Sequence, residues 1–198
     1  MAPRQPGPYA AATALPDRLR LRRLLTSELT PGEERSIRVL LAAAFGTAEE
    51  DRFREEDWQH SVGGFHFVLD LEGQIVAHAS VVERELHVGR MPLRTGYVEA
   101  VATAPGHQGR GYATLVMRAV GAYIRGRFEL GALGTGVHGL YERLGWLTWA
   151  GPSSVRAPSG EHRTPEEDGY ILVLPTPASP RLDLAAPISC DWRPGDVW

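Results

Sequence analysis

The chain has 198 residues, a hydrophobic content of 43% and a formal net charge of -3. This size and composition suit one globular domain of α/β type, and the slightly acidic balance argues against general attraction to nucleic acid or anionic membrane. A single cysteine, Cys190, excludes an internal disulfide and a cysteine-rich zinc site, and no long apolar segment indicates a signal peptide or membrane span, so the cytoplasm is the expected compartment.

The N-terminal part of the sequence predicts a tail followed by a strand. Residues 1–16 are rich in Pro, Ala and Gly without apolar periodicity, which indicates a disordered or loosely attached tail. The remaining residues, 17–198, are expected to form the single domain. The segment 18–25 begins as an alternating strand, and we favour a solvated face for its arginines over a contact with nucleic acid.

A capping box predicts the first helix. Thr30 and Glu33 have the spacing at which each side chain can bond the backbone of the other, and the apolar stripe that follows ends near Gly46. The next segment, residues 49–57, is acidic, and a solvated charge run is its simplest interpretation.

Two strands joined by a tight turn follow the acidic segment. They are expected at residues 65–69 and 74–88, with the turn at 71–73. Three histidines on these strands lack metal-ligand spacing, so no metal site is supported and packing or surface positions are expected. They are His66, His78 and His87.

The most informative stretch is a strand, a glycine-broken turn and a helix in direct succession. Residues from Tyr97 to Thr103 are rich in β-branched side chains, and from Ala113 onward apolar residues recur at helical spacing. Between them, Gly109 and Gly111 allow backbone amides to point at an anion where the helix begins. A tight turn without a ligand is the alternative interpretation of these two glycines.

One acidic residue, Glu99, interrupts the apolar strand. A carboxylate there is costly unless it faces a cleft or is hydrogen-bonded. We therefore treat Glu99 as a candidate functional residue, and a structural role is the alternative.

The rest of the chain alternates short strands with a helix and ends in loop-like segments. Strands are expected at residues 128–135, 146–149 and 170–174, and a short helix at 137–144. Residues 151–169 are rich in Pro, Ser and Gly and predict a long loop, and residues 175–198 predict an irregular tail.

The order Gln-x-x-Gly-x-Ala directly after an apolar strand resembles the acetyl-CoA signature of the GCN5-related N-acetyltransferase (GNAT) superfamily. The resemblance implies a GNAT fold: a mixed, mostly antiparallel central sheet with helices on both faces, splayed where the central strand meets the CoA arm. By analogy with that family, a homodimer is also expected. The resemblance also implies that the backbone of Val101 and Thr103 pairs with the pantetheine arm. The loop residues that would bind acetyl-CoA are Gln108, Gly109, Arg110, Gly111, Tyr112 and Ala113.

Tyr141 lies on the predicted helix 137–144 in a Leu-Tyr-x-x-x-Gly-Trp context. A tyrosine on an amphipathic helix is most often a packing residue. In the GNAT superfamily, however, a tyrosine at this place often protonates the CoA sulfur. The resemblance thus implies Tyr141 as general acid, with Glu99 as general base, directly or through a water, and amides near Val101 as oxyanion donors.

Four further motifs resemble the aminoglycoside 2'-N-acetyltransferases, in the same order along nearly the whole chain after the tail. They are residues 57–64, 96–99, 163–169 and 190–198. An aminoglycoside carries several ammonium groups, so its site should be lined with carboxylates. The acceptor ligands that this resemblance implies are Asp57, Glu99, Glu167, Asp196 and the carboxylate of Trp198, with Asp51 as a further candidate.

The chain departs from the family pattern at two places. Arg52-Phe53 stands where relatives carry an Asp-Phe pair, and Asp51 one residue earlier is the possible replacement. The segment 133–136 stands where relatives have a serine-rich run, so a sugar contact is either missing or supplied by Thr135. The acceptor preference is therefore left open.

Three functions are compatible with these features. The first is transfer of the acetyl group of acetyl-CoA to the 2'-amine of aminoglycosides by direct attack on the thioester, in a resistance enzyme or a housekeeping relative. The second is a GNAT acetyltransferase that acts on another amino sugar, a polyamine or a peptide amine. The third is a non-catalytic acyl-CoA or drug-binding module, against which Glu99 and Tyr141 both argue.

Overall fold

The computed structural model describes residues 18–46 and 52–198. The predicted tail, residues 1–16, and the candidate ligand Asp51 lie outside the described residues. Within the described part, all strands belong to one ten-stranded sheet in the order β6-β9-β5-β4-β3-β10-β7-β8, and β2 and β1 extend it from β3. The strands are β1 (Leu19–Leu25), β2 (Phe65–Leu71), β3 (Gln74–Val88), β4 (Met91–Thr103), β5 (Leu130–Gly134), β6 (Leu147–Thr148), β7 (Ser153–Ala157), β8 (Gly160–Arg163), β9 (Ile171–Pro175) and β10 (Ile188–Asp191).

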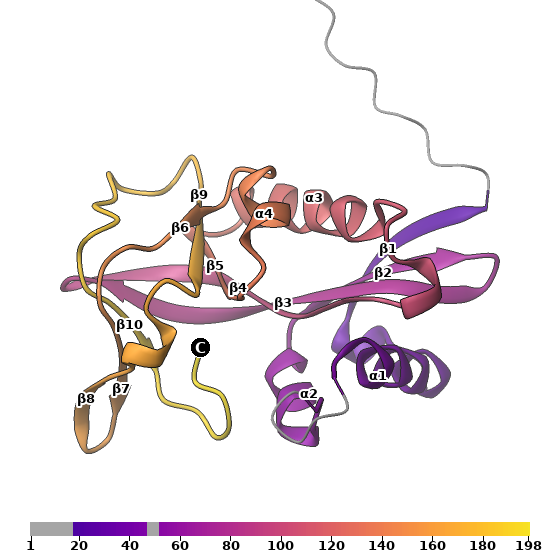
Figure 1. Cartoon of the computed structure of the whole chain (residues 1–198), viewed down its shortest axis with the longest axis horizontal. Helices are drawn as coiled ribbons and strands as arrows, with labels where there is room; N and C mark the ends of the chain where they lie inside the picture. The colour runs from indigo at the N-terminus through magenta and orange to yellow at the C-terminus, as the bar shows by residue number, and fades with distance from the viewer. Residues whose placement is uncertain (1–17, 47–51) are drawn as a thin grey trace, which may run out of the picture.

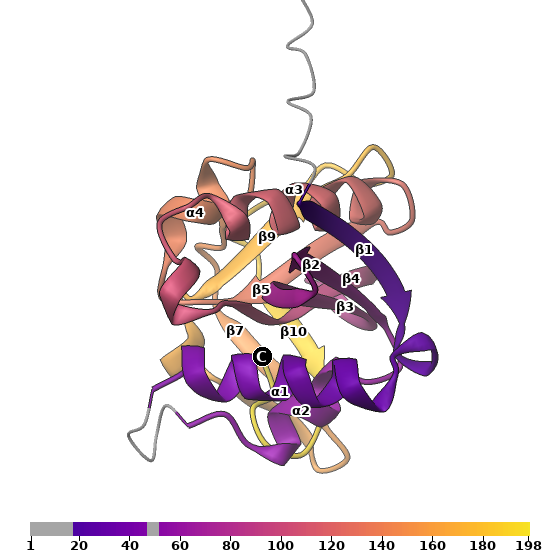
Figure 2. The same cartoon turned by 90° about the vertical axis from the view of Figure 1, so that its right-hand side faces the viewer.

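Helices cover both faces of this sheet, as predicted (Figures 1 and 2). They are α1 (Pro31–Ala44), α2 (Glu55–Ser61), α3 (Tyr112–Arg125) and α4 (His138–Glu142), with 3₁₀ turns at Thr26–Glu28, Pro105–His107 and Pro165–Glu167. Figure 2 shows α3 and α4 on one side of the sheet and α1 and α2 on the other. None of the helices in the described ranges is both long and apolar enough to cross a membrane.

The predicted capping box begins α1. The amide of Glu33 donates to Thr30 Oγ1 at 3.2 Å, and the amide of Thr30 donates to Glu33 Oε2 at 2.9 Å. The helix buries Ile37 and Leu41 completely against the sheet, in the cluster that also contains Trp58 of α2. The helical prediction for this segment is therefore confirmed.

The long strand β3 connects the two halves of the sheet. Its first half pairs with β2, and its last residues pair with β10. The predicted turn before it is confirmed, with positive φ angles of 54° at Glu72 and 87° at Gly73, as a tight hairpin requires. On its other edge β3 pairs with β4 along most of its length.

The sheet splays between β4 and β5, as predicted. These parallel strands pair only from Thr95 to Tyr97 of β4, opposite Leu130 to Ala132 of β5. Beyond Tyr97, β4 continues without β5 as a neighbour. The second half of β4 therefore offers an open edge to a ligand on the side of α3 and α4.

Two loop predictions were wrong. Residues 151–169 contain the hairpin of β7 and β8, and residues 175–198 contain β10, while the end of the acidic run begins α2 with Glu55 and Glu56 exposed. Both errors have one cause, because β10 lies between β3 and β7 and pairs with both. A strand whose partners are far along the chain takes its conformation from those partners, whatever its local composition.

Candidate active site

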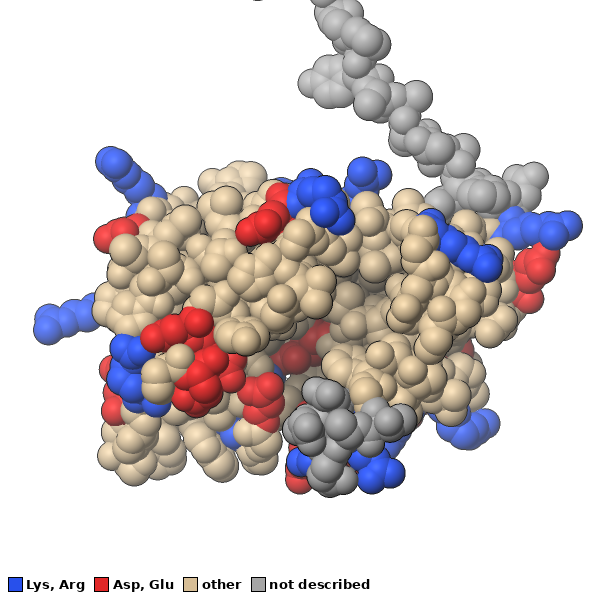
Figure 3. All heavy atoms as spheres, in the orientation of Figure 1, with Lys and Arg blue, Asp and Glu red and all other residues tan. Residues whose placement is uncertain are grey.

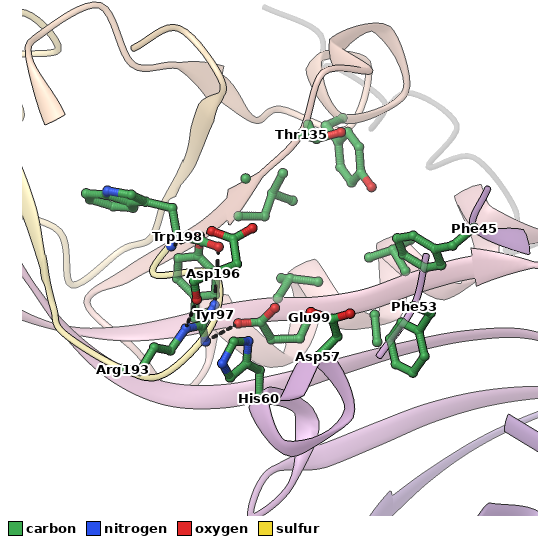
Figure 4. Close-up of a pocket in the computed structure, with 16 residues that line it drawn as sticks. Phe45, Phe53, Asp57, His60, Tyr97, Glu99, Thr135, Arg193, Asp196 and Trp198 are labelled. Carbon is green, nitrogen blue, oxygen red and sulfur yellow. Dashed lines mark hydrogen bonds and ion pairs between the residues drawn. The ribbon is translucent and has the colours of Figure 1, made fainter. Parts of the chain in front are cut away.

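A cavity of about 250 Å³ opens where β4 and β5 diverge. In Figure 4, Glu99 and Asp57 lie near each other on its floor, with Arg193, Asp196 and Trp198 on one side and Phe45 and Phe53 on the other. Figure 3 shows acidic side chains around a hollow on this face of the molecule. The cavity is thus built from β4, β5, α2, α4 and the C-terminal segment.

Glu99 reaches this cavity because β4 is irregular at that point. Ser80 of β3 lies opposite Glu99 and His78 opposite Ala102, so two β4 residues face one β3 residue in a β-bulge. Burial raises the pKa of Glu99 to about 7, although the neighbouring Arg193 lowers it. A carboxyl group with this pKa exchanges a proton near neutral pH, which suits a general base.

Arg193 is a site residue that we did not single out in the sequence, although it lies within one of the quoted motifs. Its Nη1 donates to Glu99 Oε1 at 2.6 Å, its Nε to the carbonyl of Asp196 at 2.7 Å, and its Nη2 to Trp198 O at 3.2 Å. The guanidinium also lies 5.6 Å from the centre of the Tyr97 ring. Arg193 thereby fastens the C-terminal segment to the candidate base.

The C-terminal segment is held at two further points. His60 of α2 donates from Nε2 to the carbonyl of Pro194 at 2.8 Å. Trp198 is 4% exposed. Its indole donates to Thr164 Oγ1 at 3.0 Å, and its amide donates to Asp196 Oδ1 at 3.2 Å. These contacts hold Trp198 beside the cavity.

A second cavity of about 610 Å³ adjoins the first, and both are bordered by Asp57, Asp196 and Trp198. Glu167 borders the second cavity, and burial raises its pKa, with Asp196 adding to the effect. Asp57 has a structural task as well, since its Oδ2 accepts from the amide of Arg54 at 2.7 Å and caps α2. The structure thus brings together every predicted acceptor ligand that it describes.

A groove of about 540 Å³ runs along the open edge of β4 to the start of α3. Its lining includes Val101, Thr103, Gln108, Gly109, Gly111, Tyr112 and Ala113, and Arg110 lies in the same loop. Gly109 and Gly111 have φ angles of 73° and 79°, which L-residues rarely adopt. No side chain caps the first turn of α3, so its amides are available to an anion such as a pyrophosphate.

Tyr141 marks the place where the cavity and the groove meet. It borders both spaces, as do Val101 and Thr135. Its ring packs edge-on against Trp146 at 6.2 Å between centroids, and burial raises its pKa to about 12. Tyr141 therefore stays protonated across the ordinary pH range and can donate a proton at this junction.

The remaining lining residues escaped the sequence analysis for lack of a local signal. Phe45 and Phe53 follow and precede a helix and form a ring pair 5.5 Å apart at the cavity wall. Tyr97 lies at the sheet's inner face and is 1% exposed. Aromatic residues at these places look like core residues in the sequence, and only the tertiary structure places them at the wall of the cavity.

Comparisons with known proteins agree with this geometry. The profile of a family described as acetyltransferase (GNAT) domain matches residues 26–148. The aminoglycoside 2'-N-acetyltransferase of Mycolicibacterium fortuitum is 45% identical over 177 residues, which cover 87% of this chain and 89% of that protein.

Solved structures share the fold. A GNAT family acetyltransferase from Brucella melitensis, in complex with acetyl-CoA, aligns over 83% of this chain and 93% of its own, with a TM-score of 0.57 and 19% identity. A GCN5-related N-acetyltransferase from Kribbella flavida aligns over 68% of this chain with a TM-score of 0.54 and 23% identity, and the match spans 34% of that chain.

Proposed function

The chain belongs to the GNAT acetyltransferase family, and we propose that it transfers the acetyl group of acetyl-CoA to the 2'-amine of aminoglycosides. One observation carries this proposal: a cavity lined with carboxylates meets an anion-binding groove at a protonated tyrosine, Tyr141. A polycationic acceptor fits the cavity, and a pyrophosphate-bearing donor fits the groove. The identity to the enzyme of M. fortuitum supports an aminoglycoside as that acceptor.

The charges of the two cavities favour a polyamine-like acceptor over a neutral one. Four carboxylate side chains border them: Asp57, Glu99, Glu167 and Asp196. An ammonium at 4 Å from one of these carboxylates gains about 4 kcal/mol at the effective dielectric constant of a partly exposed site. The positive charge of Arg193 offsets part of this negative field, and an ammonium group of the acceptor would compete with Arg193 for Glu99.

In the proposed reaction, different residues of the chain have different roles. When bound, acetyl-CoA supplies a thioester carbonyl that the acceptor amine attacks. Glu99 takes the proton that the amine nitrogen loses as the N–C bond forms, directly or through one water. The amide of Val101 stabilises the negative charge on the carbonyl oxygen, and Tyr141 gives its proton to the sulfur as the C–S bond breaks.

The test is thiol release that depends on both acetyl-CoA and acceptor. Kanamycin B carries a 2'-amine, whereas kanamycin A carries a 2'-hydroxyl at the same position, so the two form a matched pair. We expect turnover with kanamycin B and none above background with kanamycin A. The mass of the product, one acetyl group heavier, checks that the released thiol reports acetyl transfer.

The two alternatives predict different results in the same assay. Equal turnover of kanamycin A and kanamycin B would contradict 2'-selectivity. Turnover of spermidine or glucosamine, with neither kanamycin accepted, would favour another amine as substrate. Binding of acetyl-CoA and kanamycin B without any thiol release would favour a binding module over an enzyme.

Acetylation turns a charged amine into a neutral amide, so we also propose that the activity reduces aminoglycoside toxicity in the cell. Expression in a susceptible bacterium is expected to raise the inhibitory concentration of kanamycin B and leave that of kanamycin A unchanged. An equal effect on both drugs would contradict this proposal.

A further inference from the structure

Two buried histidines connect the surface of the fold to the irregular part of β4. His66 of β2 and His78 of β3 are both 0% exposed, and His66 Nδ1 lies 2.9 Å from His78 Nε2. Outward, His66 Nε2 lies 2.9 Å from Thr26 Oγ1. Inward, His78 Nδ1 lies 2.9 Å from the carbonyl oxygen of Ala100. None of these groups has a task in the acetyl transfer proposed above.

The inner end of this series of hydrogen bonds determines which atom is the donor in each of them. The carbonyl of Ala100 can only accept, so His78 carries its proton on Nδ1 and its Nε2 accepts from His66 Nδ1. The Nε2 of His66 then accepts from the hydroxyl of Thr26, which at 2.9 Å is nearer to this nitrogen than to its other acceptor, the carbonyl of Gly64, at 3.2 Å. Burial lowers the pKa of His66 to about 4 and that of His78 to about 3. Both rings are therefore neutral near pH 7, as this arrangement requires.

The carbonyl at the inner end belongs to the β-bulge of β4. Ala100 and Val101 lie outside the residue-by-residue pairing of β3 with β4, and Ala100 has a φ angle of 52°, which is unusual for a residue with a side chain. The preceding carbonyl, of Glu99, accepts from Ser80 Oγ at 3.2 Å. Buried side chains of β3 thus take the place of the missing ladder bonds at the bulge.

The carbonyl of Ala100 and the amide of Val101 form one peptide unit. In a planar trans peptide these two groups point in opposite directions. A carbonyl held toward His78, inside the sheet, therefore turns the amide of Val101 away from the ladder, and Val101 borders both the cavity and the groove. We propose that His78, oriented by His66 and Thr26, is a positioning residue that aims the Val101 amide at the reacting carbonyl oxygen.

This inference rests on the proposed acetyl transfer, because it assigns the amide of Val101 to the oxyanion of that reaction. Two physical effects act in the same direction. The hydrogen bond from His78 fixes the orientation of the peptide, and a carbonyl that accepts a strong bond polarises its own N–H group. Removing one oxyanion donor costs about 10² to 10³ in kcat in enzymes where it has been measured. We expect an effect at the lower end, because the donor is misdirected rather than lost.

The first test compares His78→Leu with His78→Asn by steady-state kinetics. Leucine removes the donor to Ala100, whereas the amide nitrogen of asparagine can take the place of Nδ1. We expect His78→Leu to lower kcat about 10²-fold with little change in either KM, and His78→Asn to recover at least about tenfold of that loss. His87→Leu is the matched control and should behave like the wild type, because His87 lies on the same strand, half-buried, with its Nε2 2.9 Å from Glu85 Oε1.

Equal losses in the leucine and asparagine variants, or a folded leucine variant with unchanged kcat, would overturn the proposal. Thermal unfolding and acetyl-CoA binding by calorimetry establish whether each variant is folded. If His78→Leu does not fold, Thr26→Val tests the outer end of the chain, and a wild-type kcat with unchanged His66 ring signals in that variant would also contradict the proposal.

A readout that does not depend on turnover separates this inference from the proposed function. In the ¹⁵N-¹H spectrum, the amide proton of Val101 is expected to shift upfield in His78→Leu and to return toward its wild-type position in His78→Asn. An amide that does not respond to His78 would overturn the positioning role even if acetyl transfer is established. A responsive amide in a protein that fails to acetylate kanamycin B would leave the positioning role standing and overturn the proposed reaction.

Discussion

Glu99→Gln is expected to lower kcat/KM for kanamycin B by about 10² to 10⁴, the usual effect of losing a positioned base. Burial raises the pKa of Glu99 to about 7, so the carboxylate form that accepts a proton becomes populated as the pH rises through 7. Below that pH the group is protonated and cannot serve as a base. The wild-type rate should therefore rise with pH, and this rise should be absent in the variant.

The acceptor amine also loses a proton in this pH range, so a single profile does not separate the two groups. The two groups are separated by comparing the pH profiles of kcat/KM of the wild type and of Glu99→Gln with the same acceptor, because the contribution of the amine is common to both. Glutamine keeps an oxygen that can accept from Arg193, which preserves the packing of the C-terminal segment. Glu85→Gln, an exposed carboxylate of β3, is the matched control. A variant with the wild-type pH dependence would exclude Glu99 as the base.

Tyr141→Phe is expected to lower kcat by about 10² to 10⁴, which corresponds to about 2.7 to 5.5 kcal/mol of activation free energy. The substitution removes the hydroxyl alone and keeps the ring that packs against Trp146. Because burial raises the pKa of Tyr141 to about 12, the hydroxyl remains protonated through the assay range. The wild-type kcat should therefore show no decrease caused by Tyr141 below about pH 10.

Tyr123→Phe is the matched control for this experiment. Tyr123 of α3 packs against Phe65 and Phe67, far from the junction of cavity and groove. Stopped-flow measurement of the first turnover is the decisive assay, since it isolates acetyl transfer from product release. A Tyr141→Phe variant whose first turnover keeps the wild-type rate would assign Tyr141 to packing and leave the thiolate to be protonated by solvent.

The segment from Tyr97 to Arg125 could be predicted because its local signals agree. β-branched residues in the strand, positive-φ glycines in the turn and helical spacing of apolar residues all specify the same conformation. The capping box of α1 and the hairpin at Glu72-Gly73 are of the same kind. Each depends on residues a few positions apart, and each appears in the structure where the sequence placed it.

Strands β7 and β10 could not be predicted in this way. Residues 153–157 and 188–191 contain serine and lie among prolines and glycines, which locally favour loops. They are strands because they pair with each other and because β10 also pairs with the end of β3. The pairing partners are distant in sequence, and the tertiary contacts outweigh a weak local preference.

The same distinction between local and tertiary information applies to the candidate site. In the sequence, Glu99 stands out as a carboxylate within an apolar strand, whereas Tyr141, the loop 108–113 and the acidic acceptor residues were candidates through resemblance to known families. Other contacts join residues on different elements. They are the ion pair of Arg193 with Glu99 and the hydrogen bonds of His60 with Pro194 and of His78 with Ala100. No spacing along the chain predicts such contacts.

By itself, then, the sequence determined which residue types stand at the β-bulge of β4, at the start of α3 and in the C-terminal motif. Only the tertiary structure decided what surrounds them. The divergence of β4 from β5 opens the cavity, and burial there moves the pKa of Glu99 toward neutrality. The physical reason is that a local motif fixes backbone conformation over a few residues, whereas burial and charge depend on every element that packs around the group.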